Sequence, residues 1–200
     1  MIKGAAFLFA LCVIRHATAA EAFKPLWDGK TLDGWHAIGK GKWTIEQGAI
    51  RGGHSKLENE YGHLVTDRSF TNFIVRLRFK SLKGNSGFYF RSEEKGWGGI
   101  SGFQAEIDPK SDIGGLYETN GRGWVVQPKA ADVKEWLKPG EWNEMIVEAI
   151  GPRITVRING KQAAQLRNDE RGQPHGKFAL QLHGGQEVDV WFKDLEIAEK

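Results

Sequence analysis

The sequence predicts an all-β protein, folded as a sandwich or jelly roll of two antiparallel sheets. Apolar and polar residues alternate in many short segments, as they do in strands that bury one face. Turn signals separate these segments, and many of the 26 glycines lie at the breaks. Helical periodicity is nearly absent, and many short strands without interleaved helices are typical of a sandwich.

Strand patterns recur through the chain. The segments with the clearest alternation are residues 72–80, 145–149, 154–158, 178–182 and 188–192. Gly151-Pro152 separates two of them and predicts a hairpin, and Asn159-Gly160 predicts a second tight turn. Residues 130–137 are the one expected helix, a short one that ends before Pro139-Gly140.

The first 20 residues have the character of a secretory signal peptide. Lys3 supplies a positive start, residues 5–14 are apolar, and Ala17-Thr18-Ala19 offers small residues for cleavage. The apolar run is short for a membrane span, which makes an uncleaved anchor the less favoured alternative. We therefore expect an exported protein, periplasmic or secreted, with no membrane contact beyond this signal. Residues 21–200 are expected to form a single domain.

Charge and cysteine content exclude several functions. Removal of Lys3 and Arg15 lowers the net charge from +3 to +1, and no basic stripe remains to favour nucleic-acid binding. The single cysteine, Cys12, lies in the signal segment, so the mature domain has neither disulfides nor thiolate chemistry. The phosphate-loop, zinc, nucleophile-elbow and dinucleotide patterns are all missing.

The most informative polar segment follows residue 102. Gln104, Glu106 and Asp108 alternate, so on a strand all three side chains project to one face while apolar residues face the core. Two carboxylates beside each other repel, which raises one pKa and permits acid–base chemistry near neutral pH. A solvated sheet face with scattered charge is the alternative interpretation.

A second polar group precedes a glycine-rich stretch, residues 91–122, where functional loops are expected. Tyr89 and Arg91 alternate onto one face, and Arg91 could stabilise a developing negative charge. A surface ion pair between Arg91 and Glu93 or Glu94 is an equally good interpretation.

Aromatic residues and one histidine complete the candidate site. Trp97, Tyr117 and Trp124 lie in or near the glycine-rich stretch, and flat rings of this kind stack well on sugars. His183 follows the apolar strand 178–182, where it could be a base, a metal ligand or a turn partner.

Several segments together resemble the 3-keto-disaccharide hydrolase family. The matching segments are residues 23–35, 43–50, 64–66, 84–87 with Tyr89 and Arg91, 140–143, 159–160 and 180–184. They begin with Phe23-Lys24-Pro25-Leu26-Trp27 and close with Leu180-Gln181-Leu182-His183-Gly184, so the resemblance spans about residues 23–197. It implies a concanavalin A-like jelly roll, in agreement with the strand pattern.

The resemblance also implies an activity. Family members act on sugars oxidised at C3, where the ketone acidifies the C2 proton. A base removes that proton, the aglycone leaves from C1, and water then adds to the 2-hydroxy-3-keto-glucal. Glycoside cleavage is the net result, and the implied partner is a 3-keto-glucoside or a related oligosaccharide.

The family's polar face maps onto residues of this chain. The implied set is Asn85, Arg91, Gln104, Glu106, Asp108 and His183. Glu106 or His183 would remove the proton, and Asp108 would position or protonate. Arg91 would stabilise the enolate, or a divalent cation would do so, with Glu106, Asp108 and His183 as its candidate ligands. Asn85, Gln104, Tyr89 and the three aromatic residues named above would bind sugar.

Three other functions compete. A retaining glucanase on the same fold uses E-x-D-x-x-E, but Ser111 stands where the second glutamate belongs and Asp112 comes one residue late. A non-catalytic carbohydrate-binding module needs the aromatic residues without the acid–base group, and the same fold hosts both. A structural or adhesion domain is the third possibility, although no repeat supports it.

Overall fold

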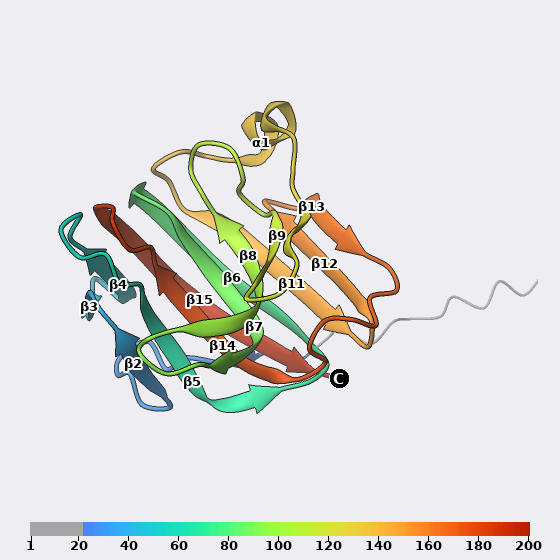
Figure 1. Cartoon of the computed structure of the whole chain (residues 1–200), viewed down its shortest axis with the longest axis horizontal. Helices are drawn as coiled ribbons and strands as arrows, with labels where there is room; N and C mark the ends of the chain where they lie inside the picture. Colours follow the sequence, from blue (N-terminus) through green and yellow to red (C-terminus); the bar gives the residue numbers. More distant parts are fainter. Residues whose placement is uncertain (1–21) are drawn as a thin grey trace, which may run out of the picture.

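The computed structural model describes residues 22–200, which form a sandwich of two antiparallel sheets (Figure 1). This confirms the predicted all-β jelly-roll fold. The predicted signal peptide, residues 1–20, lies outside the described residues. Within residues 22–200, no helix has the length and apolar character needed to cross a membrane.

One sheet has eight strands in the order β13-β12-β11-β6-β15-β4-β3, with β1 paired to β15. Their bounds are β1 Lys24–Pro25, β3 Lys42–Glu46, β4 Ala49–His54, β6 Phe73–Lys83, β11 Asn143–Ile150, β12 Arg153–Ile158, β13 Lys161–Leu166 and β15 Val188–Glu199. The other sheet has seven strands in the order β10-β9-β8-β7-β14-β5-β2. Their bounds are β2 Trp35–Gly39, β5 Gly62–Phe70, β7 Ser86–Glu94, β8 Ile100–Ile107, β9 Leu116–Thr119, β10 Gly123–Val126 and β14 Gly176–Leu182.

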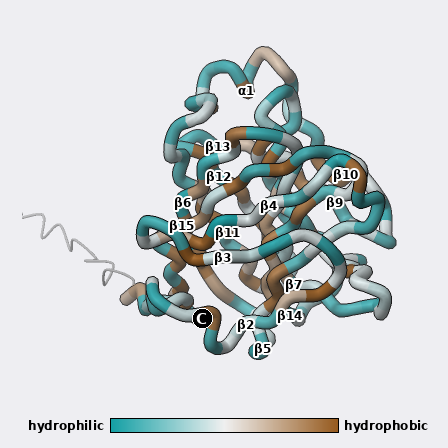
Figure 2. The backbone as a smooth tube through the Cα atoms, turned by 90° about the vertical axis from the view of Figure 1, so that its left-hand side faces the viewer, coloured by the Kyte–Doolittle hydropathy of each residue, from teal (hydrophilic) through white to brown (hydrophobic). Residues whose placement is uncertain are grey.

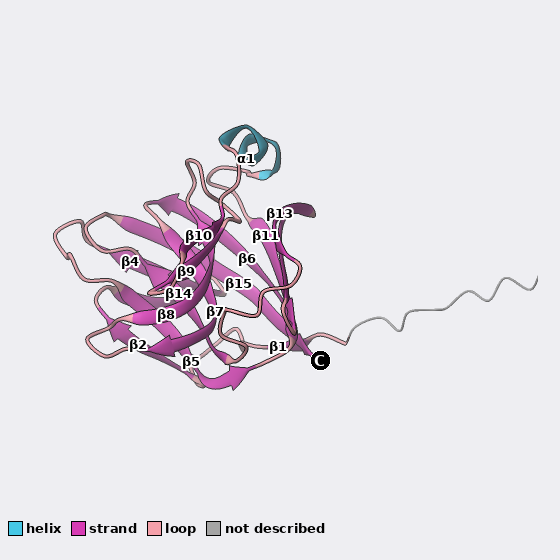
Figure 3. Cartoon of the chain, turned by 45° about the vertical axis from the view of Figure 1, so that its right-hand side comes forward, coloured by secondary structure: helices cyan, strands magenta, loops and turns pink. Residues whose placement is uncertain are grey.

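The predicted turns and the predicted helix are confirmed. Gly151-Pro152 joins β11 to β12, and Asn159-Gly160 joins β12 to β13. Both residues of the second turn have positive φ, 48° and 79°, which a two-residue hairpin of this twist requires. The helix α1, Ala130–Trp136, lies at one end of the sandwich, outside both sheets (Figure 3).

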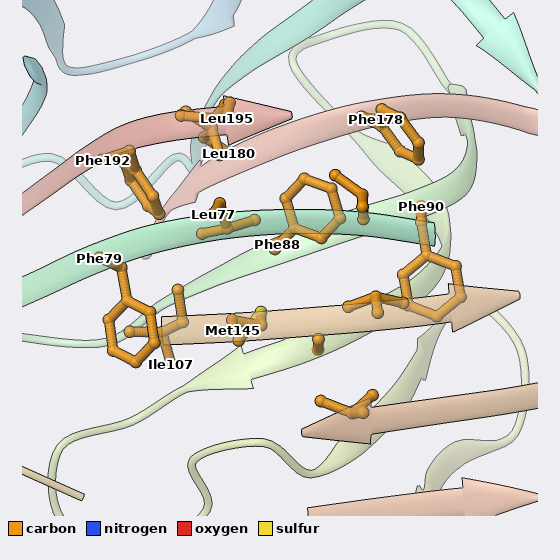
Figure 4. Close-up of a cluster of buried hydrophobic side chains, with 14 of the residues drawn as sticks. Leu77, Phe79, Phe88, Phe90, Ile107, Met145, Phe178, Leu180, Phe192 and Leu195 are labelled. Carbon is orange, nitrogen blue, oxygen red and sulfur yellow. The ribbon is translucent and has the colours of Figure 1, made fainter. Parts of the chain in front are cut away.

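The core lies between the two sheets and is rich in phenylalanine. The ring of Phe178 lies 4.3 Å from Phe70, 4.7 Å from Phe73 and 5.3 Å from Phe88, measured between ring centroids. Phe73 belongs to the eight-stranded sheet and the others to the seven-stranded sheet, so this cluster joins the two layers. Figure 4 shows neighbouring core side chains from both sheets packed together.

The seven-stranded sheet also buries residues on its outer face. Every residue of β8 is buried, although only alternate side chains can reach the core between the sheets. Figure 2 shows hydrophilic and hydrophobic positions along the backbone, with much of the outer surface hydrophilic. Buried polar side chains nevertheless lie on the seven-stranded sheet, among them Gln104 and Glu106. Buried polar groups on a sheet face need partners, and their partners define the candidate site.

Candidate functional site

A cavity of about 480 Å³ lies on the outer face of the seven-stranded sheet. Six residues predicted from the sequence line it: Asn85, Tyr89, Gln104, Glu106, Tyr117 and His183. They come from β7, β8, β9 and the segments at the ends of β7 and β14, so antiparallel pairing brings distant parts of the chain together. Residues that the sequence reasoning did not propose as site residues line it too: Tyr61, His63, Thr119, Asn120 and Gln181.

Glu106 is the central charged group of this cavity. Its carboxylate accepts hydrogen bonds from Asn85 Nδ2 at 2.5 Å and from Gln104 Nε2 at 2.9 Å. Its backbone is held by Gly114 and Gly115, which keeps the end of β8 in place. Burial raises the pKa of Glu106 to about 8, against the opposing effect of the Asn85 hydrogen bond.

The predicted effect of neighbouring carboxylates is present but secondary. Asp108 and Asp112 also raise the Glu106 pKa, yet the loss of water around the buried carboxyl has the larger effect. The expectation that Gln104 and Glu106 share one face is confirmed. The expectation that Asp108 joins them is wrong, because β8 ends at Ile107 and the Asp108 carboxylate turns to accept from Lys110 N at 2.7 Å.

His183 lies just beyond β14, as predicted, and pairs with a residue that the sequence did not reveal. Its Nδ1 donates to Gly184 O at 2.6 Å, which leaves Nε2 facing the Tyr61 hydroxyl at 2.9 Å. The two rings lie 4.5 Å apart. With Nδ1 as the donor, Nε2 accepts a hydrogen bond from the Tyr61 hydroxyl. Burial and then the charge of Glu106 raise the pKa of Tyr61.

His63 forms a neutral, buried wall of the cavity. Its Nδ1 donates to Gly98 O at 3.1 Å, and burial lowers its pKa to about 4. The His63 ring lies edge-on to Tyr89 at 5.5 Å. Knowledge of strand pairing could have revealed His63 as a site residue, because it lies opposite Gln181 in the β5–β14 register and both residues line the cavity.

The structure does not bring Arg91 to the cavity. The strand alternation that predicts a shared face with Tyr89 breaks at a register shift between Phe90 and Glu93, where Arg91 has a φ of 48°. The buried guanidinium donates instead to the carbonyl oxygens of Thr71 and Gly151 at 2.9–3.2 Å. It holds the β5–β6 and β11–β12 turns together. Within residues 22–200 it forms no ion pair with Glu93 or Glu94, which pair with Lys95 and with Lys177 and His36.

Two of the three predicted sugar-stacking residues lie outside the cavity wall. Trp97 is fully exposed on the turn between β7 and β8, two residues before Gly99 of the cavity. Trp124 is 38% exposed and packs edge-on against Tyr117, with ring centroids 5.3 Å apart. Tyr117 itself lines the cavity, so Trp124 supports that wall from outside.

The residues proposed as metal ligands do not fit a metal ion. Within residues 22–200, no three side chains of His, Cys, Asp or Glu are grouped so that they could hold one. Both Glu106 oxygens face amide N–H donors, where a cation would be repelled by the same hydrogens. Asp108 is turned to its own loop, and both nitrogens of His183 already have partners.

Comparisons with known proteins support the fold and the family resemblance. A 3-keto-disaccharide hydrolase of Bacteroides thetaiotaomicron is 36% identical over 84 residues, which cover 38% of this chain and 29% of that protein. The chain therefore matches less than a third of this curated relative's length.

Solved structures show the same sandwich. A putative glycosyl hydrolase of Parabacteroides distasonis superposes with a TM-score of 0.67 at 21% identity, covering 89% of this chain and 94% of that one. A carbohydrate binding module of Bacillus subtilis superposes with a TM-score of 0.65 at 15% identity, covering 83% and 96%. At these identities the likeness establishes the fold alone.

A family model spans almost the whole described chain. The 3-keto-alpha-glucoside-1,2-lyase-like domain matches residues 22–198, which include every strand of both sheets except the last residue of β15. The match agrees with the family resemblance noted in the sequence. This chain belongs to the 3-keto-alpha-glucoside-1,2-lyase-like domain family.

Proposed function

We propose that this protein is an exported enzyme that cleaves 3-keto-glycosides by elimination followed by hydration. The observation that carries the proposal is a single buried carboxyl, Glu106, on the wall of the cavity, with its pKa raised to about 8. A base in this range suits abstraction of a proton made acidic by a neighbouring ketone. Family membership and the name of the curated relative support the same reaction.

Ordinary glycoside displacement fits the cavity poorly. Both retaining and inverting mechanisms use two carboxyl groups that flank the bond. Glu106 is the one Asp or Glu among the described residues that line the cavity. Asp112, which comes one residue late for the glucanase pattern, instead accepts from Ser111 and Gln127. Elimination needs one carbon base and a proton donor, and the cavity offers both.

In the first step Glu106 takes the proton from C2, and the electron pair of that C–H bond forms the enolate of the C3 ketone. The enolate returns to the ketone as the C1–C2 double bond forms and the C1–O bond breaks. The departing oxygen needs a proton. The Tyr61 hydroxyl, hydrogen-bonded to His183, is the donor we assign to that oxygen.

In the second step water adds to C1 of the unsaturated ketone. Glu106 returns its proton to C2, and the Tyr61–His183 pair takes the proton that the water loses. Both groups end in the states in which they began, so the cycle needs no oxidant or reductant. Arg91 has no part in this scheme, because its guanidinium donates to the backbone carbonyls of Gly151 and Thr71.

Incubation with 3-keto-trehalose or a 3-keto-glucoside, with release of glucose or aglycone as the readout, tests the proposal. Glu106→Gln should lower turnover by at least about 10²-fold, the usual contribution of a positioned base, while substrate binding is largely kept. Glu93→Gln is the matched control, since the Glu93 side chain is exposed and forms an ion pair with Lys95 on the surface. Equal turnover by the two variants would exclude Glu106 as the base. Parallel reactions with a chelator measure any dependence on a divalent cation.

A non-catalytic carbohydrate-binding module is the second candidate. The similarity to the Bacillus subtilis module favours it, as does the exposed Trp97 beside the cavity. This function predicts sugar binding without product release, and Glu106→Gln would then weaken binding. Calorimetric titration alongside the turnover assay separates the two functions.

A further inference from the structure

Three buried side chains and the partly buried Thr119 form a chain of hydrogen bonds that begins at Glu106. Gln104 Nε2 donates both to Glu106 Oε2 at 2.9 Å and to Gln181 Oε1 at 3.1 Å. Gln181 Nε2 then donates to the Tyr89 hydroxyl at 3.1 Å, and that hydroxyl contacts Thr119 Oγ1 at 2.8 Å. Gln104, Gln181 and Tyr89 are each at most 4% exposed, so water does not replace these bonds.

The chain of hydrogen bonds has a direction. Both hydrogens of the Gln104 amide are used, one by Glu106 and one by Gln181, because the same nitrogen makes both bonds. Gln181 can accept from Gln104 only with its oxygen on that side, which turns its own N–H groups toward Tyr89. The amide groups of Asn85 and Gln104 therefore both present N–H donors to the Glu106 oxygens. An ionised carboxylate, which only accepts hydrogen bonds, fits this arrangement.

A protonated Glu106 requires a different arrangement of these hydrogen bonds. Its O–H would have to face an amide N–H of Gln104 or of Asn85. Gln104 could accept the proton by turning its oxygen to Glu106, but an oxygen in that place cannot donate to Gln181 Oε1, and this bond would be lost. Gln181 would then have to turn as well, and the Tyr89 proton would have to move from Thr119 to Gln181.

A glycine provides the space that the Gln104 amide occupies. Gly87 lies opposite Glu106 in the β7–β8 register, and a Cβ added there would lie 2.3 Å from Gln104 Nε2. The amide therefore fills the volume above Gly87. We propose that Gln181 is a positioning residue that holds the Gln104 amide in this orientation and thereby stabilises the ionised form of Glu106. The proposal rests on the proposed function in one respect: that function makes the ionised Glu106 the catalytic base.

Other titratable groups lie near Glu106 or line the same cavity, and they must be kept constant in a test. They are Asp108 and Asp112 beyond the end of β8, Tyr61 and His63 at the start of β5, Tyr89 on β7, Tyr117 on β9 and His183 after β14. No Lys or Arg is among the described residues that line the cavity. The neutral amides of Asn85 and Gln104 thus replace the cation that often accompanies a buried carboxylate.

Gln181→Met tests the proposal, because it keeps the length of the side chain and removes the amide. Stabilisation of a charged group by one hydrogen-bond chain corresponds to about a tenfold change in its ionisation equilibrium. We expect the midpoint of the kcat–pH profile to rise by about one pH unit, with kcat at pH 7 about tenfold lower and KM little changed. A carboxyl ¹³C NMR titration, with the Glu106 signal assigned by its loss in Glu106→Gln, should show the same rise.

Gly87→Ala provides an independent variant, because its methyl group displaces the Gln104 amide and leaves Gln181 intact. It should raise the Glu106 titration midpoint in the same direction. Gly53→Ala is the matched control, since a Cβ there meets nothing within 4 Å. An unchanged Glu106 midpoint in either folded variant would overturn the proposal, even if activity fell. The NMR titration does not depend on turnover, so failure of the proposed function leaves this test intact.

Discussion

Replacement of Glu106 by glutamine should change how the stability of the protein depends on pH. The carboxyl has an ordinary pKa of 4.5, and burial raises it to about 8 in the folded chain. Below pH 4.5 it is protonated in both states and costs nothing. Between pH 4.5 and 8 the unfolded chain ionises while the folded chain stays protonated, so the free energy of unfolding falls as pH rises.

The magnitude follows from the same two values. They differ by about 3.5, and each pH unit is worth about 1.36 kcal/mol, so the wild-type protein should lose at most about 5 kcal/mol relative to Glu106→Gln. Urea unfolding of both proteins between pH 4 and 9 measures this difference. Glu93→Gln, at an exposed site, should follow the wild-type curve at every pH. Parallel curves for wild type and Glu106→Gln would refute the argument that burial governs this carboxyl.

Three further predictions concern residues outside the carboxylate. Arg91→Met should lower the free energy of unfolding by about 3 kcal/mol in urea unfolding, because the carbonyls of Thr71 and Gly151 lose a charged donor. The kcat of the folded fraction should stay unchanged, and a large fall in kcat would indicate that Arg91 has a catalytic role. Phe178→Ala should cost about 3–5 kcal/mol in urea unfolding, since it empties the centre of the phenylalanine cluster, and a cost below ~1 kcal/mol would contradict that packing. Trp97→Ala should change stability by less than about 0.5 kcal/mol and raise KM for longer glycosides, and an unchanged KM would exclude it from binding.

Local pattern was sufficient for the strands and for part of the site. Alternation has a period of two, so Gln104 and Glu106 had to share a face and the residues between them had to face the core. Turn chemistry at Asn159-Gly160 likewise depends on φ preferences of single residues. These properties are local, and the structure agrees with each of them.

Alternation failed where the backbone departs from a regular strand. The register shift after Phe90 turns Arg91 away from Tyr89, and nothing in the residue types themselves announces that shift. The end of β8 likewise separates Asp108 from Glu106. A β-bulge or a strand end depends on what the neighbouring strand offers, which is a property of the assembled sheet.

The sequence by itself determined the sandwich, the family, and six of the residues that line the cavity. Only the tertiary structure decided that Tyr61 meets His183, that His63 closes a wall, and that Gln181 connects Gln104 to Tyr89. It also decided that burial is the main cause of the raised Glu106 pKa. The physical reason is that side-chain direction along one strand is a local property, whereas pairing between strands and exclusion of water arise only when distant segments pack together.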